Sequence, residues 1–172
     1  DRRTKLSEGQ MRVVGLDPDL LDGFGGFELA DGGAARLRDL ADGEVFISEE
    51  AGKELDARAG DQLDVFLEGG TVTVAVRAIV ARGGLAGVDP NMLLPLARAQ
   101  EMFDRPGEIN SIVVSNTGDE RSGAELSREV AKELRVFFND RAVATQLKEI
   151  FGQAPVLEAL EKKRDEEGLG EE

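Results

Sequence analysis

Residues 44–80, EVFISEEAGKELDARAGDQLDVFLEGGTVTVAVRAIV, form the stretch of this chain that decides its fold. A short apolar run ends at Ser48, whose hydroxyl can accept a hydrogen bond from an unpaired N–H in the first turn of a helix. Glu49 lies at the positive end of that helix dipole and can pair with Lys53 four residues later. The first half of the stretch therefore predicts a strand that runs directly into a short helix.

The second half of the stretch has the alternation of a β-hairpin. Gly60-Asp61 turns the chain, and Gly69-Gly70 can adopt the positive φ angles of a two-residue hairpin loop. Apolar residues occupy alternate positions around that loop, at Leu63, Val65 and Leu67 before it and at Val72, Val74, Val76, Ala78 and Val80 after it. Because turn residues, capping and periodicity agree, we expect a strand, a helix and a hairpin in this order.

A chain of 172 residues is long enough for one domain or for two small lobes. Its hydrophobic content of 41% and charged content of 33% indicate a soluble globular protein with a buried core. The sequence has no apolar stretch of about 18 residues that could span a bilayer. Its polar opening, DRRTKLSEGQ, looks more like the interior of a longer chain than a natural N-terminus.

The net charge of −14 argues against a nucleic-acid partner. Phosphate backbones are bound by clustered lysine and arginine side chains, and here 35 acidic residues outnumber 21 basic ones. The same charge disfavours a large contact with anionic lipid but is compatible with a position on the outer side of a membrane.

The chain has no cysteine and no histidine. It therefore lacks a thiolate nucleophile, an imidazole base, a disulfide and a zinc site of the usual nitrogen and sulfur type. Ser48, Ser111 and Ser122 lie outside any Gly-x-Ser-x-Gly motif and have no histidine to activate them. The sequence predicts no catalytic residue, no cofactor and no metal ligand.

One acidic cluster, Asp17, Asp19 and Asp22, invites a calcium interpretation, but its spacing is wrong. A loop of the EF-hand type would place an oxygen ligand at Leu21 and a glycine at Asp22. The glycines that follow are not flanked by the strand and helix of a phosphate-binding loop. A solvated turn followed by a flexible loop is the better interpretation.

Four apolar residues on glycine-rich loops are the candidate contact residues for a partner: Phe24, Phe27, Leu85 and Val88. An apolar side chain on such a loop is either tucked under the loop or offered to another molecule.

Outside residues 44–80 we expect a strand at 11–16, a loop at 17–33 with at most one helical turn, a short helix at 34–40, a strand at 92–94, a helix from Pro95, and a strand at 109–116. Ser122 and Glu125 have the spacing of a capping box. Leu126, Val130, Leu134 and Phe137 follow at helical spacing and are expected in a core. Residues 142–151 and 156–164 also predict helices. Strands and helices in this order favour an α+β fold with a mixed sheet.

The order of these motifs resembles the periplasmic core domain of MacB-like and FtsX-like ABC transporter permeases. EVFISEEAGKELDARAGDQLDVF is similar to that family's strand, glutamate, alanine–leucine helix and Gly-Asp-x-Leu turn. The family's order continues with TVTVAVRAIVA, RGGLAGVDP, LLPLARAQEMF, INSIVVSN and SGAELSREVAKELR, of which LLPLARAQEMF carries a Pro-Leu-x-x-Ala-Gln-x-x-Phe pattern. VVGLDPD is similar to the family's Val-x-Gly-x-Asp-Pro strand end. The resemblance covers about residues 11–138.

The resemblance implies a domain outside the membrane, between the first and second transmembrane helices, with a small β-rich lobe inserted into a porter-like βα lobe. We expect the porter-like lobe at residues 1–43 plus 104–155, the inserted lobe at 44–103, and a charged C-terminal tail at 156–172 leading towards the membrane. Such domains usually begin with a further strand and helix, so the porter-like lobe is expected to be incomplete at its N-terminus.

The function that the resemblance implies is non-catalytic. The domain would couple the motion of membrane helices to an external substrate or partner, at the extracytoplasmic face of a bacterial membrane. ATP hydrolysis would belong to a separate domain or subunit. The implied partners are the protein's own transmembrane helices, that ABC ATPase, an unidentified external substrate or partner, and a second copy of the permease.

Two alternatives remain open at this point. The first is a free-standing acidic α+β metal-dependent enzyme or ligand-binding protein that would use carboxylates such as Asp17, Asp61 or Asp89. The second is the sensing domain of another kind of membrane protein.

Overall fold

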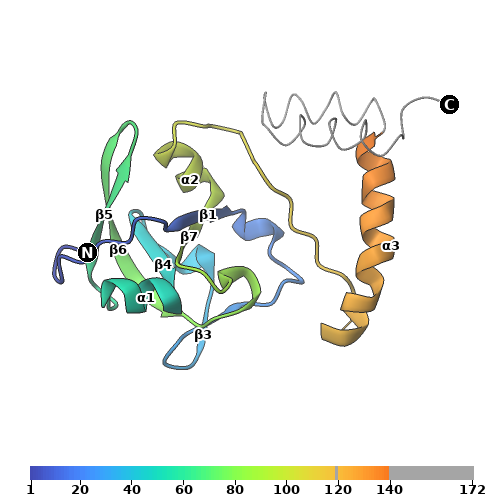
Figure 1. Ribbon diagram of the computed structural model, residues 1–172, viewed down its shortest axis with the longest axis horizontal. Coiled ribbons are helices and arrows are strands. Elements are labelled where there is room, and N and C mark those ends of the chain that lie inside the picture. Colours follow the sequence, from blue (N-terminus) through green and yellow to red (C-terminus); the bar gives the residue numbers. More distant parts are fainter. Residues whose placement is uncertain (119, 140–172) are drawn as a thin grey trace. The chain divides into compact units, whose positions relative to one another are not determined.

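The computed structural model describes residues 1–118 and 120–139, and the chain divides into two compact units, Asp1–Pro106 and Gly107–Glu172 (Figure 1). The first unit contains β1 (Arg12–Leu16), η1 (Pro18–Leu20), β2 (Phe27–Glu28), β3 (Ala34–Ala35), η2 (Leu37–Asp39), β4 (Glu44–Ser48), α1 (Glu49–Leu55), β5 (Gln62–Leu67), β6 (Gly70–Val80), η3 (Gly84–Ala86), β7 (Asn91–Pro95) and α2 (Leu96–Met102), where η marks a short 3-10 helix. The described residues of the second unit form an extended segment and α3 (Glu120–Asn139). The predicted α+β class and mixed sheet are confirmed.

The main sheet has five strands in the order β1-β7-β4-β6-β5. The pairs β1–β7 and β4–β6 are parallel, and the pairs β7–β4 and β6–β5 are antiparallel. Strand β4 lies at the centre, where Ile47 pairs with Met92 on one side and with Ile79 on the other. The strand that opens the stretch at residues 44–80 is therefore the middle of the fold.

Both faces of the central strands are buried. Alternate side chains of a strand point to opposite faces, so Val45 and Ile47 pack into one hydrophobic cluster and Phe46 into another. The first cluster also contains Ala51 and Leu55 of α1 and Ala99 of α2. The second is built from the segment before β4 and the loop before β7, and its members are Phe27, Ala35, Leu37, Phe46, Val80, Ala86 and Leu93.

Helix α1 begins at Ser48 as predicted. The Ser48 hydroxyl accepts a hydrogen bond from the Ala51 backbone N–H at 3.3 Å. The same oxygen accepts from the Asn91 N–H at 2.9 Å and donates to the Asp89 carbonyl at 2.8 Å. Lys53 lies 3.4 Å from Glu49, the predicted ion pair. Ser48 therefore caps the helix and also fixes the start of β7.

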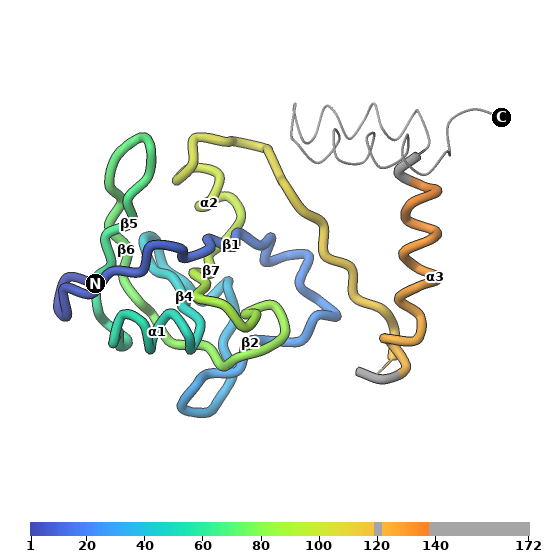
Figure 2. The backbone as a smooth tube through the Cα atoms, in the orientation of Figure 1, coloured from blue at the N-terminus to red at the C-terminus, as the bar shows by residue number. Residues whose placement is uncertain are grey.

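The β5–β6 hairpin is confirmed, but its loop is one residue earlier than predicted. Leu67 pairs with Gly70, so the two loop residues are Glu68 and Gly69, and Gly70 has a φ of 134°. Residues 70–74 of β6 pair only with β5, and this end of the hairpin projects as a two-stranded ribbon (Figure 2). Its outward face carries Phe66, which is 79% exposed.

The strand pairing differs from the predicted assignment of the N-terminal strand. That strand was expected in the lobe formed by residues 1–43 plus 104–155, but β1 pairs along its whole length with β7. Residues 17–43 cover the second face of the same sheet, and η2 replaces the helix predicted at 34–40. Residues 1–43 thus belong to one compact unit with residues 44–103. The reason is that Phe46 and Leu93 need an apolar cover, which Phe27 and Leu37 supply.

In the second unit the strand predicted at residues 109–116 is wrong. Within the described part of the chain no strand pairs with this segment, which is extended and exposed. The helix predicted after it is confirmed as α3, although it begins at Glu120, so Ser122 lies within its first turn and is not the N-cap. The apolar stripe of α3 is only partly buried, with Leu126 and Phe137 exposed. The helices predicted at 142–151 and 156–164, and the tail at 156–172, lie outside the described residues.

Candidate functional site

Two arginines attach the N-terminal arm, residues 1–6: Arg2 binds the β5–β6 hairpin, and Arg3 binds the turn before β5. The Arg2 guanidinium donates to both carboxylate oxygens of Asp64 at 2.9 and 2.8 Å and to the Thr73 hydroxyl at 3.0 Å. Arg3 donates to both oxygens of Asp61, at 2.8 to 3.0 Å. Bidentate arginine–carboxylate pairs fix geometry as well as charge, so the arm lies in one place on the hairpin.

These contacts set the electrostatics of the two aspartates. The hydrogen bonds from Arg3 hold the pKa of the Asp61 carboxyl below its usual value. Hydrogen bonds from Arg2, and then from Thr73, lower the pKa of Asp64 in the same way. A carboxylate that accepts such bonds is stabilised in its charged form.

The three carboxylates considered for a metal-dependent site have separate surroundings. Asp17 accepts from the Asp19 N–H at 3.0 Å and caps η1. Asp61 accepts from the Arg58 N–H at 2.9 Å as well as from Arg3, so it fastens the turn before β5. Asp89 lies 4.0 Å from Arg12 in a largely exposed pair. Among the described residues, no three acidic side chains come together as a metal site.

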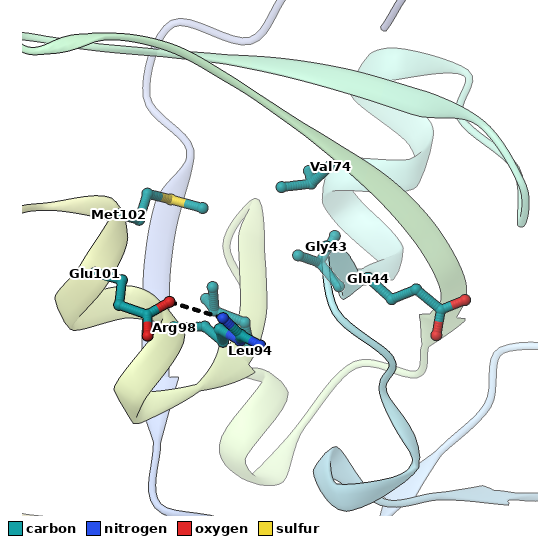
Figure 3. Close-up of a pocket in the computed structure, with 8 residues that line it drawn as sticks. Gly43, Glu44, Val74, Leu94, Arg98, Glu101 and Met102 are labelled. Carbon is teal, nitrogen blue, oxygen red and sulfur yellow. Dashed lines mark hydrogen bonds and ion pairs between the residues drawn. The ribbon is translucent and has the colours of Figure 1, made fainter.

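A groove lies between α2 and the sheet, at the start of β4 and beside Val74 of β6 and Leu94 of β7 (Figure 3). Its volume is about 290 Å³, and its lining residues are Gly43, Glu44, Val45, Val74, Leu94, Arg98, Glu101 and Met102. Val45, Val74 and Leu94 belong to the first hydrophobic cluster, so the floor of the groove is apolar.

The rim of the groove is charged. Arg98 donates to Glu101 at 2.8 Å, and it also donates to Asp42. The hydrogen bonds to Glu101 and then to Asp42 raise the pKa of the Arg98 guanidinium. Small-molecule sites usually have volumes of about 300 to 1,000 Å³. A groove at the lower limit, with its one cation already paired to two carboxylates, suits a single apolar side chain better than a cofactor.

The four predicted contact residues do not form one surface. Phe27 lies in β2 and is buried, with its ring 6.2 Å from that of Phe46. Leu85 is half-buried against the same cluster. Phe24 is half-buried and is not part of that cluster, and only Val88, at 55%, is largely exposed.

The most exposed phenylalanine among the described residues, Phe66, is not one of the four contact residues predicted from the sequence. Phe66 occupies an outward position of the β5–β6 hairpin, where the alternation of Leu63, Val65 and Leu67 already requires a side chain that points away from the core. An aromatic residue at a strand position that faces solvent could have indicated this contact surface from the sequence. The groove could not be predicted because α2 is distant from β4 and β6 in sequence.

Comparison of the chain with protein-family models and with curated proteins gave no match. None of the described helices is long and apolar enough to cross a membrane.

Proposed function

We propose that this chain is a non-catalytic extracytoplasmic domain of an ABC transporter permease of the MacB-like or FtsX-like kind. In this role it couples the motion of membrane helices to an external substrate or partner. ATP hydrolysis belongs to a separate domain or subunit, and the domain works at the outer face of a bacterial membrane.

The observation that carries this proposal is the contact between two motifs of the resemblance. Gly15 is the glycine of VVGLDPD. Ala99 is the second alanine of LLPLARAQEMF, the one directly before the glutamine. A side chain at Gly15 would place its Cβ only 2.5 Å from the Ala99 Cβ and 3.3 Å from the Leu96 Cα. Two motifs of the resemblance that lie about 80 residues apart therefore pack against each other in one unit, which supports a shared structural role for them, although the resemblance assigned them to separate lobes.

The packing of the first unit suits a mechanical role. Both faces of the central strands are covered, and Ser48 links β4, α1 and β7 through three hydrogen bonds. Close-packed interiors deform little and transmit displacement. The first unit is therefore suited to transmit a displacement as one body.

The surfaces available for an external contact are the apolar groove beside α2 and the projecting hairpin with Phe66. Val88 adds an exposed apolar residue on the loop before β7. A metal-dependent enzyme has no specific observation in its favour, since Asp61 is fully engaged by Arg3 and the Arg58 N–H.

The proposal is tested by the position of the domain in living cells. Because these 172 residues contain no cysteine, Val88→Cys in the complete protein introduces the one thiol of this domain, on an exposed loop, and the unsubstituted complete protein gives the background labelling. A membrane-impermeant maleimide should label this variant in intact cells, while Val76→Cys, which is buried, should react only after unfolding. Labelling of Val88→Cys only after cell lysis would contradict an extracytoplasmic position.

A further inference from the structure

The extended segment before α3 is the most unusual surface in the described part of the chain. Residues 109–118 have no charge, the longest such run in a sequence with 33% charged residues. Ile112, Val113 and Val114 are 51%, 54% and 48% exposed. Three consecutive β-branched residues favour a strand, yet none of the strand pairings among the described residues includes them.

The sequence of this segment reads nearly the same in both directions. Around Val113, the residues Asn110-Ser111-Ile112 mirror Val114-Ser115-Asn116, and the only difference is isoleucine against valine. In a pair of antiparallel strands, the residue numbers of two facing residues add up to the same value along the whole pair. Two copies that pair about Val113 would therefore place like residues opposite each other along seven positions.

We propose that residues 110–116 form an antiparallel strand pair with the same residues of a second copy of this chain, about a two-fold axis at Val113. Identical patches that meet across a two-fold axis are the usual form of a homodimer contact. Ile112 of one copy would lie beside Val114 of the other, and Ser111 beside Ser115. Cross-strand pairs of β-branched residues such as Ile112 and Val114 stabilise antiparallel sheets.

Charge favours this segment as the place where a second copy meets the first. Two copies with a net charge of −14 each repel one another over most of their surfaces. Residues 109–118 contribute nothing to that repulsion. In the proposed register Glu108 lies opposite Gly118 of the other copy, so the nearest preceding carboxylates do not face each other.

The C-terminal end of the segment is fixed by the Asn116 side chain. The Asn116 side chain donates to the Gly123 carbonyl at 2.8 Å and to the Ser127 hydroxyl at 3.1 Å. These bonds attach the end of the segment to α3. A segment that is anchored at one end loses less conformational entropy on association than a free one.

Disulfide trapping tests the register in the 172-residue chain, whose lack of cysteine gives a clean background. Directly paired residues in antiparallel strands have Cα atoms about 4.5 or 5.5 Å apart, within the range of a disulfide. Val113→Cys should therefore form a covalent dimer with oxidised glutathione. Ile112→Cys alone and Val114→Cys alone should not, because each residue is roughly 8 Å from its own copy.

Two further samples complete the test. An equimolar mixture of Ile112→Cys and Val114→Cys should cross-link, since these positions face each other in the proposed pair. Val136→Cys on α3, at 68% exposure, reports the rate of random collision. Cross-linking of Val113→Cys at least tenfold faster than Val136→Cys supports the proposal, and equal rates overturn it.

Sedimentation velocity of chains that carry no introduced cysteine measures self-association independently of cross-linking. The unsubstituted chain should show a concentration-dependent monomer–dimer equilibrium in the range of about 10 µM to 1 mM, as expected for a small interface. Val113→Lys should remain monomeric throughout, because it places two like charges opposite each other. A strictly monomeric unsubstituted chain, or a dimer that persists in Val113→Lys, would overturn the proposal.

Discussion

Gly15 shows how one residue can decide the relation between a strand and a helix. Strand β1 runs beneath α2, and the space between their backbones admits only a hydrogen at Gly15. The residue opposite Gly15 is Ala99, whose side chain is a single methyl group that belongs to the first hydrophobic cluster. The close approach of α2 to β1 therefore depends on both residues being small.

Gly15→Ala should lower the free energy of unfolding by about 1–3 kcal/mol, the usual effect of overpacking in a core. Ala99→Gly alone should lower it by about 1 kcal/mol because glycine weakens a helix interior. The double variant should be more stable than the sum of the two effects, since removing the Ala99 methyl makes room for the new one. Urea unfolding followed by circular dichroism measures all three.

Gly9→Ala is the matched control, because a Cβ at Gly9 would have no neighbour within 4 Å. Its effect should stay within about 0.5 kcal/mol. If Gly15→Ala is as mild as this control, the close contact between β1 and α2 is not as described.

At the residue scale, local chemistry was predictable and long-range burial was not. The roles of Ser48, Glu49 and Lys53 follow from capping and helical spacing, which involve neighbours in sequence. Phe27 was expected on an exposed loop because its surroundings are rich in glycine. Its burial depends on Phe46, which nothing near Phe27 reveals.

The N-terminal arm is the clearest case of electrostatic attachment at the scale of elements. The depressed pKa values of Asp61 and Asp64 mean that the folded state favours the charged carboxylates more than the unfolded state does. This stabilisation is fully present above the unfolded aspartate pKa of about 3.9. It is lost as the pH falls through the lower, folded values.

Arg3→Gln should therefore lower the midpoint of thermal unfolding at pH 7, and the difference from the unsubstituted chain should shrink below about pH 4. Arg12→Gln, which removes only a 4.0 Å surface pair, should change the midpoint much less at either pH. Thermal unfolding by circular dichroism from pH 2 to pH 7 makes the comparison. An equal loss at pH 2 and pH 7 would show that Arg3 does not act through Asp61.

The contrast between β7 and residues 109–116 shows the limit of strand prediction. Both stretches are short, apolar and β-branched or aliphatic, and both were predicted as strands. Residues 91–95 become a strand because β1 and β4 lie on either side of them. Periodicity reports the preference of a segment, whereas pairing needs a partner elsewhere in the chain.

At the scale of the whole molecule, the compact unit is larger than the lobe predicted from the resemblance. Residues 44–103 contain four of the five main strands but not β1, and not the cover of the second hydrophobic cluster. Without Phe27 and Leu37, the side chains of Phe46 and Leu93 would face water. The fold class followed from sequence because it depends on the order of elements, but this grouping depends on which segment covers which face.

A fragment of residues 1–106 should therefore fold by itself, with dispersed amide resonances and cooperative thermal unfolding. A fragment of residues 44–103 should lack both properties, since it exposes one face of the central strands. Heteronuclear NMR spectra and thermal denaturation compare the two. Cooperative folding of 44–103 with the stability of 1–106 would instead support the lobe predicted from the sequence.

The proposed role of this domain in an ABC permease is tested by ATP hydrolysis of the complete protein purified from membranes. We expect that the complete protein is extracted only with detergent and that it carries, or co-purifies with, an ATP-hydrolysing domain or subunit. A permease with the whole first unit, residues 1–106, replaced by a short flexible linker should still bind that subunit but lose coupling to transport. A complete protein that is recovered without detergent, or that has no associated ATP hydrolysis, would contradict the account.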